Sequence, residues 1–134
     1  MDHAAAQGWL DRYVEAWLTY DAAQIGGLFS DDVVYRYHPY DAPIVGRAAV
    51  VASWLGDSSE PGESERDQPR TYEASYAPVA VDGDVVVATG TSSYRDEPGG
   101  PVVRVFHNCF VMRFDGDSRC REFTEFYIQR PEPG

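Results

Sequence analysis

The second half of the chain is the feature that most constrains the fold. From Thr71 to Gln129, runs rich in β-branched and aromatic residues are separated by short segments of Gly, Pro, Asp and Ser. Asp82-Gly83 is a typical signal for a tight hairpin turn. The pattern predicts four consecutive antiparallel strands, over residues 72–81, 85–95, 102–114 and 119–129. Residues 130–134 are predicted to be a tail.

Helical periodicity in the first half predicts what covers this sheet. Between Ala4 and Tyr20, apolar residues recur at i, i+3, i+4 and i+7, as in an amphipathic helix. Asp21-Ala-Ala-Gln24 is typical of a capping box, so a second, short helix is expected from Asp21. A strand over 33–38 and a third helix over Arg47–Leu55 follow. With the helices first and the meander after them, residues 1–134 predict a single α+β domain, with three helices packed on one face of an antiparallel sheet.

The composition limits the kinds of partner. The formal net charge is −11, whereas nucleic acids and anionic membranes are bound through clustered positive charge, so neither is expected. There is no apolar run of about 18 residues and no signal peptide, and we therefore expect a cytoplasmic protein. There is no phosphate-binding loop or Cys-x-x-Cys pair, and the histidines lack i, i+4 spacing, so we expect no cofactor and no metal ion. The breaker-rich segment from Gly56 to Arg70 is predicted to be a solvated loop or a lid over a site.

The register of the last hairpin predicts which side chains share a face. If Asp115 to Ser118 form a symmetric four-residue turn, Phe114 lies opposite Arg119, and every second residue back along both strands points to the same side. The further pairs on this side are Phe110 with Phe123, Asn108 with Glu125, and Phe106 with Tyr127. This face is aromatic with two polar groups in its middle, and it is the face that we expect to border a cavity.

The opposite face of the same two strands is also largely apolar. Its members are Val103, Val105, His107, Cys109, Val111, Thr124 and Phe126. Because three helices can cover only one side of the sheet, we expect a homodimer formed through this outer face. In the predicted register Cys109 faces Thr124 and Cys120 faces Arg113, so both cysteines are expected to be free thiols.

Several short motifs resemble a known family. They are Arg12-Tyr13, Leu28-Phe-Ser-Asp-Asp-Val33, Gly46-Arg-Ala-Ala-Val50, Val111-Met-Arg-Phe-Asp115 and Cys120-Arg-Glu-Phe-Thr-Glu-Phe-Tyr127. Together they resemble nuclear-transport-factor-2-like domains of the SnoaL-like kind, over nearly the whole chain. The resemblance implies a cone-shaped fold in which the helices and the concave face of a curved sheet enclose a deep, mostly apolar pocket. The fold hosts isomerases, cyclases, dehydratases, epoxide hydrolases and non-catalytic binders, so it does not by itself assign an activity.

Ketosteroid isomerases share this fold and allow a comparison residue by residue. The resemblance places their oxyanion-hole tyrosine on Tyr13. Their general-base aspartate falls on Tyr37, or on His38 if the following proline is used as the anchor, and their second oxyanion donor falls on Phe110. Two of the three groups are therefore absent, and steroid isomerisation is not expected.

Glu125 is the first candidate catalytic residue. A carboxylate between Phe123 and Tyr127 on the cavity face would be partly desolvated, which raises its pKa and suits it to general acid or base work. The alternative is a structural acid held by Asn108 or by an arginine such as Arg104. Arg104 has the inward parity near the open end of the sheet, where it could attract an anionic group or form a surface salt bridge.

Tyr13 and His38 are the other candidate catalytic residues. A phenol that faces an apolar pocket can donate a hydrogen bond to a carbonyl or a developing enolate, although tyrosine is also a common core residue. His38 precedes Pro39 at the expected pocket mouth, where it could act as a base near neutral pH or be a solvated loop residue. The residues expected to contact a ligand are Tyr35, Tyr37, Trp17, Trp54, Asn108, Phe106, Phe110, Phe123 and Tyr127.

Three functions fit these residues. The first is a cofactor-independent isomerase, cyclase or dehydratase that moves protons on a small apolar ring compound. The second is a module that binds an apolar small molecule without converting it. The third is a dimeric interaction domain with a filled pocket. The environment of Glu125 distinguishes them, because only the first function needs a titratable group that is open to a ligand.

Overall fold

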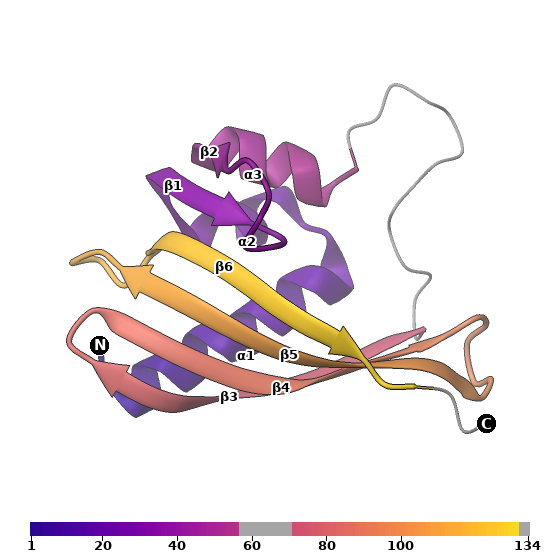
Figure 1. The fold of residues 1–134 in the computed structure, drawn as a ribbon. Coiled ribbons are helices and arrows are strands. Elements are labelled where there is room, and N and C mark those ends of the chain that lie inside the picture. Colours follow the sequence, from indigo (N-terminus) through magenta and orange to yellow (C-terminus); the bar gives the residue numbers. More distant parts are fainter. Residues whose placement is uncertain (57–70, 132–134) are drawn as a thin grey trace.

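The computed structural model describes residues 1–56 and 71–131, which form a curved sheet with helices packed against it (Figure 1). The elements in chain order are α1 His3–Thr19, α2 Ala22–Gly27, β1 Phe29–Arg36, β2 Ile44–Val45, α3 Arg47–Trp54, β3 Tyr72–Asp82, β4 Val85–Arg95, β5 Val102–Phe114 and β6 Cys120–Gln129. The α+β class predicted from the sequence is confirmed. Of the segment predicted to be a loop or a lid, residues 57–70 lie outside the described residues.

The six strands lie in the order β2-β1-β6-β5-β4-β3. Strands β3 to β6 form the predicted antiparallel meander. Strand β1, however, runs parallel to β6, so the sheet is mixed, and the edge strand β2 was not predicted. The backbone N–H of Cys120 donates to the carbonyl oxygen of Leu28 at 2.9 Å and joins the starts of the two parallel strands. Periodicity within one strand carries no signal about which distant strand it joins, so the sequence could not predict this pairing.

Side-chain caps set the limits of the first two helices. The carboxylate of Asp2 accepts the backbone N–H of Ala5 at 2.7 Å, and Asp21 accepts that of Gln24 at 2.9 Å, as the capping box predicts. Tyr20 ends α1 in the left-handed conformation, with φ 52°. Within the described ranges, no helix is long and apolar enough to cross a membrane.

An aromatic core fills the space between α1 and the sheet. Trp9 is fully buried and lies edge-on to Phe29 and Phe114, with ring centroids 6.0 and 5.4 Å apart. Its indole N–H donates to the carbonyl oxygen of Leu28 at 2.9 Å, so burial of the ring leaves no polar atom unsatisfied. Tyr13, one turn further along α1, stacks on Trp9 at 5.5 Å. This core fixes α1 against the sheet and thereby positions the residues that follow Tyr13.

The register of the last hairpin differs from the prediction by two residues. Asp115 pairs with Arg119 across a three-residue turn, in which Ser118 has φ 60° and the Asp115 carboxylate accepts the N–H of Asp117 and of Arg119. A bulge at Arg121 then adds one more residue to β6. The observed pairs are Phe114 with Cys120, Met112 with Phe123, Phe110 with Glu125, Asn108 with Tyr127, and Phe106 with Gln129.

The even size of this shift preserves the predicted faces beyond the bulge. Side chains alternate with a period of two, so Phe123, Glu125 and Tyr127 still point to the same side as Asn108. The predicted position of Cys120 opposite Arg113 was wrong. Cys120 precedes the bulge, pairs with Phe114 and is fully buried on the inner side. Cys109 lies opposite Phe126 rather than Thr124. Both cysteines are free.

Candidate functional site

A pocket of about 320 Å³ lies between the helices and the inner face of the sheet, which is the face that carries Phe110 and Phe123. Helix α1 contributes Trp17, helix α3 contributes Ser53 and Trp54, and the segment that follows β1 contributes Tyr37. The sheet contributes Ser92, Tyr94, Arg104, Phe106, Asn108, Glu125 and Tyr127. Small-molecule sites occupy roughly 300–1,000 Å³, so the pocket has room for a small ligand.

Glu125 is the carboxylate of this pocket. Burial raises its pKa to about 7, while the hydrogen bond from Asn108 and the positive charge available to His38 lower it. The side-chain amide of Asn108 donates to Oε2 of Glu125 at 2.9 Å. Among the described residues, none donates a hydrogen bond to Oε1 and no arginine pairs with this carboxylate. Glu125 is therefore partly desolvated, held at one oxygen and free to exchange a proton near neutral pH.

Asn108 holds Glu125 in place through a short chain of hydrogen bonds. The hydroxyl of Ser92 donates to Oδ1 of Asn108 at 3.3 Å, which leaves the NH₂ group of the amide directed at Glu125. Ser92 and Asn108 are buried, with 2 % and 8 % of their surfaces exposed. Both belong to inward-facing positions of adjacent strands, since Gly90 pairs with Asn108 and Ser92 with Phe106. The amide thus supports the ionised form of Glu125 without neutralising it.

A second chain of hydrogen bonds reaches the pocket from outside. Oδ2 of Asp41 lies 2.9 Å from Nδ1 of His38, and Nε2 of His38 lies 2.8 Å from the hydroxyl of Tyr127. Because an ionised carboxylate only accepts, Nδ1 carries a proton, and Nε2 of a neutral His38 accepts the hydrogen of Tyr127. If Nε2 is protonated, it donates to the phenol oxygen instead and frees the hydroxyl hydrogen of Tyr127. The chain therefore links the protonation of a half-exposed histidine to a phenol at the pocket wall.

Aromatic rings form the rest of the wall. Trp17 and Trp54 stack with their ring centroids 4.1 Å apart and an interplanar angle of 17°. The hydroxyl of Tyr37 hydrogen-bonds Oγ of Ser53 at 2.9 Å, which joins the end of β1 to α3. Phe106 and Tyr127 meet edge to face at 5.4 Å. Aromatic rings and polar side chains therefore share the pocket surface, which offers an apolar ligand body both a wall to pack on and several hydrogen-bonding groups.

The structure sorts the candidate residues into three groups. Those that line the pocket are Trp17, Tyr37, Trp54, Phe106, Asn108, Glu125 and Tyr127. Those in the aromatic core, each with at most 3 % of its surface exposed, are Tyr13, Tyr35, Phe110 and Phe123. His38 lies outside the pocket and touches it through Tyr127. Burial raises the pKa of both Tyr13 and Tyr35, so the two phenols stay neutral.

Four residues of the site were not among the candidates. Ser53, Ser92 and Tyr94 line the pocket, and Asp41 anchors His38. Pairing across the turn over 96–101 would have placed Ser92 and Tyr94 on the inner face, because Tyr94 lies opposite Arg104. The contact between Asp41 and His38 is local, at i, i+3, whereas the role of Ser53 depends on how α3 docks and has no sequence signal.

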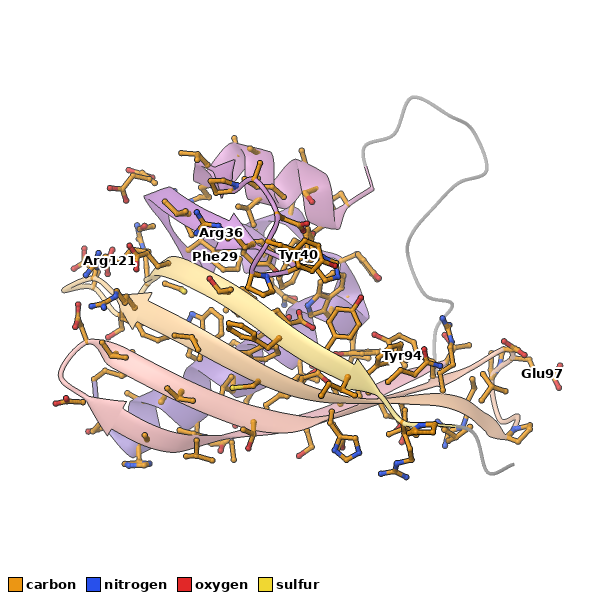
Figure 2. All side chains as sticks on the ribbon, in the orientation of Figure 1. Phe29, Arg36, Tyr40, Tyr94, Glu97 and Arg121 are labelled. Atoms are coloured by element: carbon orange, nitrogen blue, oxygen red, sulfur yellow. The ribbon has the colours of Figure 1, made fainter. Side chains whose placement is uncertain are left out.

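A second hollow, of about 810 Å³, is bordered by outer-face residues and shares Asn108, Glu125 and Tyr127 with the pocket. His38 and Tyr40 border it from the loop after β1, and Cys109, Phe126 and Ile128 line it from β5 and β6. Phe126 and Ile128 expose 43 % and 75 % of their surfaces. In Figure 2, Tyr40 stands at the rim between the helices and the last strands. Within the described residues, no group of three side chains is arranged to hold a metal ion.

Comparisons with known proteins agree with this architecture. The family model of the SnoaL-like domain matches residues 10–123. A crystal structure of an NTF-2-like protein of unknown function from Burkholderia xenovorans LB400 superposes with a TM-score of 0.66. That structure is 15 % identical, and the alignment covers 98 % of this chain and 88 % of the other, so the likeness concerns the fold alone. No curated protein sequence matches.

Proposed function

Because the chain belongs to the SnoaL-like domain family, we propose that its pocket binds a small, mostly apolar molecule and catalyses a cofactor-independent proton transfer on it. The reaction class is an isomerisation, a cyclisation or a dehydration of a compound that carries a carbonyl or hydroxyl group. The observation that carries the proposal is Glu125, whose pKa is raised to about 7 by burial and whose Oε1 has no described partner. At neutral pH such a group is present in both protonation states, as a general base and general acid requires.

Glu125 acts as the base in this proposal. Its Oε1 takes a proton from a carbon next to the carbonyl of the ligand, and the electron pair of the broken C–H bond moves onto the carbonyl oxygen. The protonated Glu125 then returns the proton to another atom of the ligand, or to a departing hydroxyl group, which leaves as water. Asn108 keeps Oε2 fixed, so the reacting oxygen points into the pocket.

Tyr127 and His38 act on the oxygen where negative charge develops. With Nε2 of His38 protonated, the hydroxyl of Tyr127 is free to donate to that oxygen, and Asp41 stabilises the positive charge of the imidazole. Tyr37, whose hydroxyl is within 2.9 Å of Ser53, is a second donor at the same wall. Tyr13 lies behind the wall, 5.7 Å from Phe123 and 5.3 Å from Trp54 between ring centroids. It therefore supports these rings in the absence of a ligand and reaches one only if they move apart.

Two measurements test this function in sequence. Native mass spectrometry of freshly purified protein identifies any small molecule that is retained. That molecule is then incubated in D₂O with the wild type and with Glu125→Gln. We expect the wild type to place deuterium on the acidic carbon and Glu125→Gln to bind the molecule without exchange. Exchange that survives in Glu125→Gln contradicts the assignment of the base.

The alternative function is binding without catalysis. It shares the pocket and the ligand class but gives no role to the raised pKa of Glu125. A retained molecule that shows no deuterium exchange with the wild type would favour this alternative.

We further propose that the protein assembles as a homodimer through the outer face. Support comes from Val111, Phe126 and Ile128, which expose 40 %, 43 % and 75 % of their surfaces on β5 and β6. Apolar side chains this exposed, gathered on one sheet face around a hollow, are typical of a contact surface.

A further inference from the structure

We propose that the ligand of the pocket is an organic anion, with an apolar body and a carboxylate or similar acidic group that binds to Arg104. This inference rests on the proposed function, because it names the chemical class of the molecule that occupies the same pocket. It adds a recognition residue, Arg104, and an orientation: the acidic group lies at Arg104 and the reacting carbon lies at Glu125.

Arg104 lines the pocket and is also exposed to solvent, so a ligand can reach it. It lies on β5, two residues before Phe106 and four before Asn108, and shares their inward side. Its guanidinium carbon lies 5.2 Å from the ring centroid of Tyr94, the residue directly opposite on β4. Figure 2 shows Tyr94 on the helix side of the sheet, short of the turn that carries Glu97. The contact places the guanidinium over the ring of Tyr94, and its N–H groups are the donors that the pocket offers to an anion.

The charge of Arg104 has no counterpart among the described residues. Four described arginines pair with carboxylates: Arg47 with Asp31, Arg95 with Glu73, Arg113 with Glu122, and Arg121 with Asp84. Among the described arginines that form no ion pair, Arg104 is the one that lines the pocket. No described carboxylate forms an ion pair with Arg104, although the chain has 22 acidic residues and 11 basic ones. A guanidinium that has no ion-pair partner can bind a carboxylate through two parallel hydrogen bonds.

The other groups of the pocket set the orientation of such a ligand. Among the described residues, its titratable members are Glu125, the phenols Tyr37, Tyr94 and Tyr127, and a single arginine, Arg104. His38 touches the pocket through Tyr127 and lowers the pKa of Glu125 by its charge, and Asp41 hydrogen-bonds His38. An anionic group next to ionised Glu125 would be repelled, so it binds at the opposite charge, Arg104. The stacked rings of Trp17 and Trp54 and the side chain of Phe106 are left for the apolar body.

The charge of Glu125 therefore opposes the binding of an anion and does not affect a neutral ligand. Because the pKa of Glu125 is raised to about 7, its neutral form is well populated at neutral pH, and an anion can enter without strong repulsion. Affinity for an anion is expected to fall as the pH rises through 7, when Glu125 ionises. A neutral ligand of the same shape should show no such change.

Two naphthalene probes with the same rings test the proposal. 1-Anilinonaphthalene-8-sulfonate carries an anionic group, and N-phenyl-1-naphthylamine lacks it. Binding of each to the full-length protein is measured by fluorescence titration, at about pH 6 and about pH 8.5, after circular dichroism has shown that each variant is folded. The variants are Arg104→Gln and Arg104→Lys. The matched control is Arg113→Gln, which removes the same charge from the far end of β5, where Arg113 pairs with Glu122.

We expect Arg104→Gln to weaken the sulfonate about tenfold or more and to change the affinity of the neutral probe less than about twofold. Arg104→Lys should be intermediate, because it keeps the charge and loses the fork of donors. Arg113→Gln should leave both probes unchanged. Ser53→Phe, which fills the pocket from α3, should weaken both probes, and sulfonate binding that survives this change would place the probe elsewhere and overturn the proposal.

Two further outcomes separate the failure of this inference from the failure of the proposed function. If the neutral probe binds in the pocket and Arg104→Gln leaves the affinity for the sulfonate unchanged, the assignment of an anionic ligand is wrong. The proposed function of the pocket is then not contradicted. If neither probe binds the wild type, the pocket itself is not a ligand site, and both proposals fall.

Discussion

At the scale of single residues, burial, a hydrogen bond from Asn108 and the charge of His38 together set the pKa of Glu125. Burial opposes ionisation, and the amide of Asn108 supports it, so the carboxyl is balanced near neutral pH. A purely structural acid is usually held by an arginine or by donors to both oxygens, and neither arrangement is found here among the described residues. Glu125 keeps one oxygen free at the cost of some folding stability, as is common at functional sites.

The first prediction concerns that stability. The ordinary pKa of a glutamate is about 4.3, and that of Glu125 in the folded protein is about 7. Between these values the folded state binds more protons than the unfolded state. The contribution of Glu125 to the free energy of unfolding is therefore fully present below the unfolded pKa and is lost as the pH rises through 7. The free energy of unfolding falls by about 3 kcal/mol over this range.

Glu125→Gln isolates this contribution because glutamine stays neutral at every pH and can still accept the hydrogen bond from Asn108. By urea unfolding, we expect Glu125→Gln to match the wild type at about pH 4 and to be more stable by about 3 kcal/mol at about pH 8.5. Parallel pH profiles for the two proteins would show that Glu125 is not desolvated.

At the scale of single residues, the sequence predicted which face of the sheet a side chain lies on but not whether that side chain borders the pocket. Alternation on two strands was enough to place Glu125, Asn108 and Tyr127 on one face. It was not enough to separate pocket residues from core residues, because Phe106 and Phe110 share the same parity and only Phe106 lines the pocket. That distinction depends on how far α1 reaches along the sheet, which no local pattern encodes.

At the scale of elements, the sheet depends on one close approach of backbones. Gly90 on β4 pairs with Tyr76 on β3. A Cβ atom at Gly90 would overlap the carbonyl oxygen of Ser75 and the ring of Tyr76. Tyr76 packs on Phe110 at 4.7 Å, so its ring cannot move without disturbing the core behind the pocket.

The second prediction follows from this approach. We expect Gly90→Ala to lower the free energy of unfolding by about 1–3 kcal/mol, since overpacking forces side chains and backbone to shift. Gly8→Ala is the control: Gly8 lies within α1 with no atom near the position of a new Cβ, and alanine should stabilise the helix by about 0.5–1 kcal/mol. Denaturant unfolding of both variants checks the pair. Equal effects of the two substitutions would contradict the close approach.

Elements also show where sequence reasoning succeeds and where it fails. Strands β4 and β5 begin and end at the predicted residues, because turn signals bracket them on both sides. The hairpin between β5 and β6 was predicted with the wrong register, because Asp115 closes a three-residue turn and Arg121 forms a bulge. Each deviation shifts the pairing by one residue, and together they shift it by two. Because side chains alternate with a period of two, the faces predicted beyond the bulge were correct although the predicted pairs were wrong.

At the scale of the whole molecule, the exposed outer face of the sheet predicts an assembly. The helices cover the inner face of the sheet, and the outer face leaves Phe126 and Ile128 exposed. We expect a homodimer by light scattering at micromolar concentration. Phe126→Arg should shift it to a monomer, because a charge buried in an apolar contact surface is costly. The control is Leu18→Arg, which puts the same charge at an exposed position of α1 away from the outer face. A wild-type protein that is monomeric in this experiment would contradict the prediction.

The family and the fold could be predicted from the sequence because short motifs along most of the chain agree with them, and the match to the SnoaL-like domain over residues 10–123 bears this out. The parallel pairing of β1 with β6 could not, since it joins segments that are about 90 residues apart. The pocket depends on that pairing. It brings Tyr37 and the loop with His38 and Asp41 next to Glu125 and Tyr127.

The measurement that tests the central claim most directly is the titration of the Glu125 carboxyl carbon by NMR, with ¹³C-labelled glutamate and the spectrum of Glu125→Gln for assignment. The burial of Glu125 predicts a midpoint near pH 7. We also expect a higher midpoint in Asn108→Ala, because the donor that favours the ionised form is removed. A midpoint near the ordinary value of about 4.3 would mean that Glu125 is solvated, and the proposed base would then be wrong.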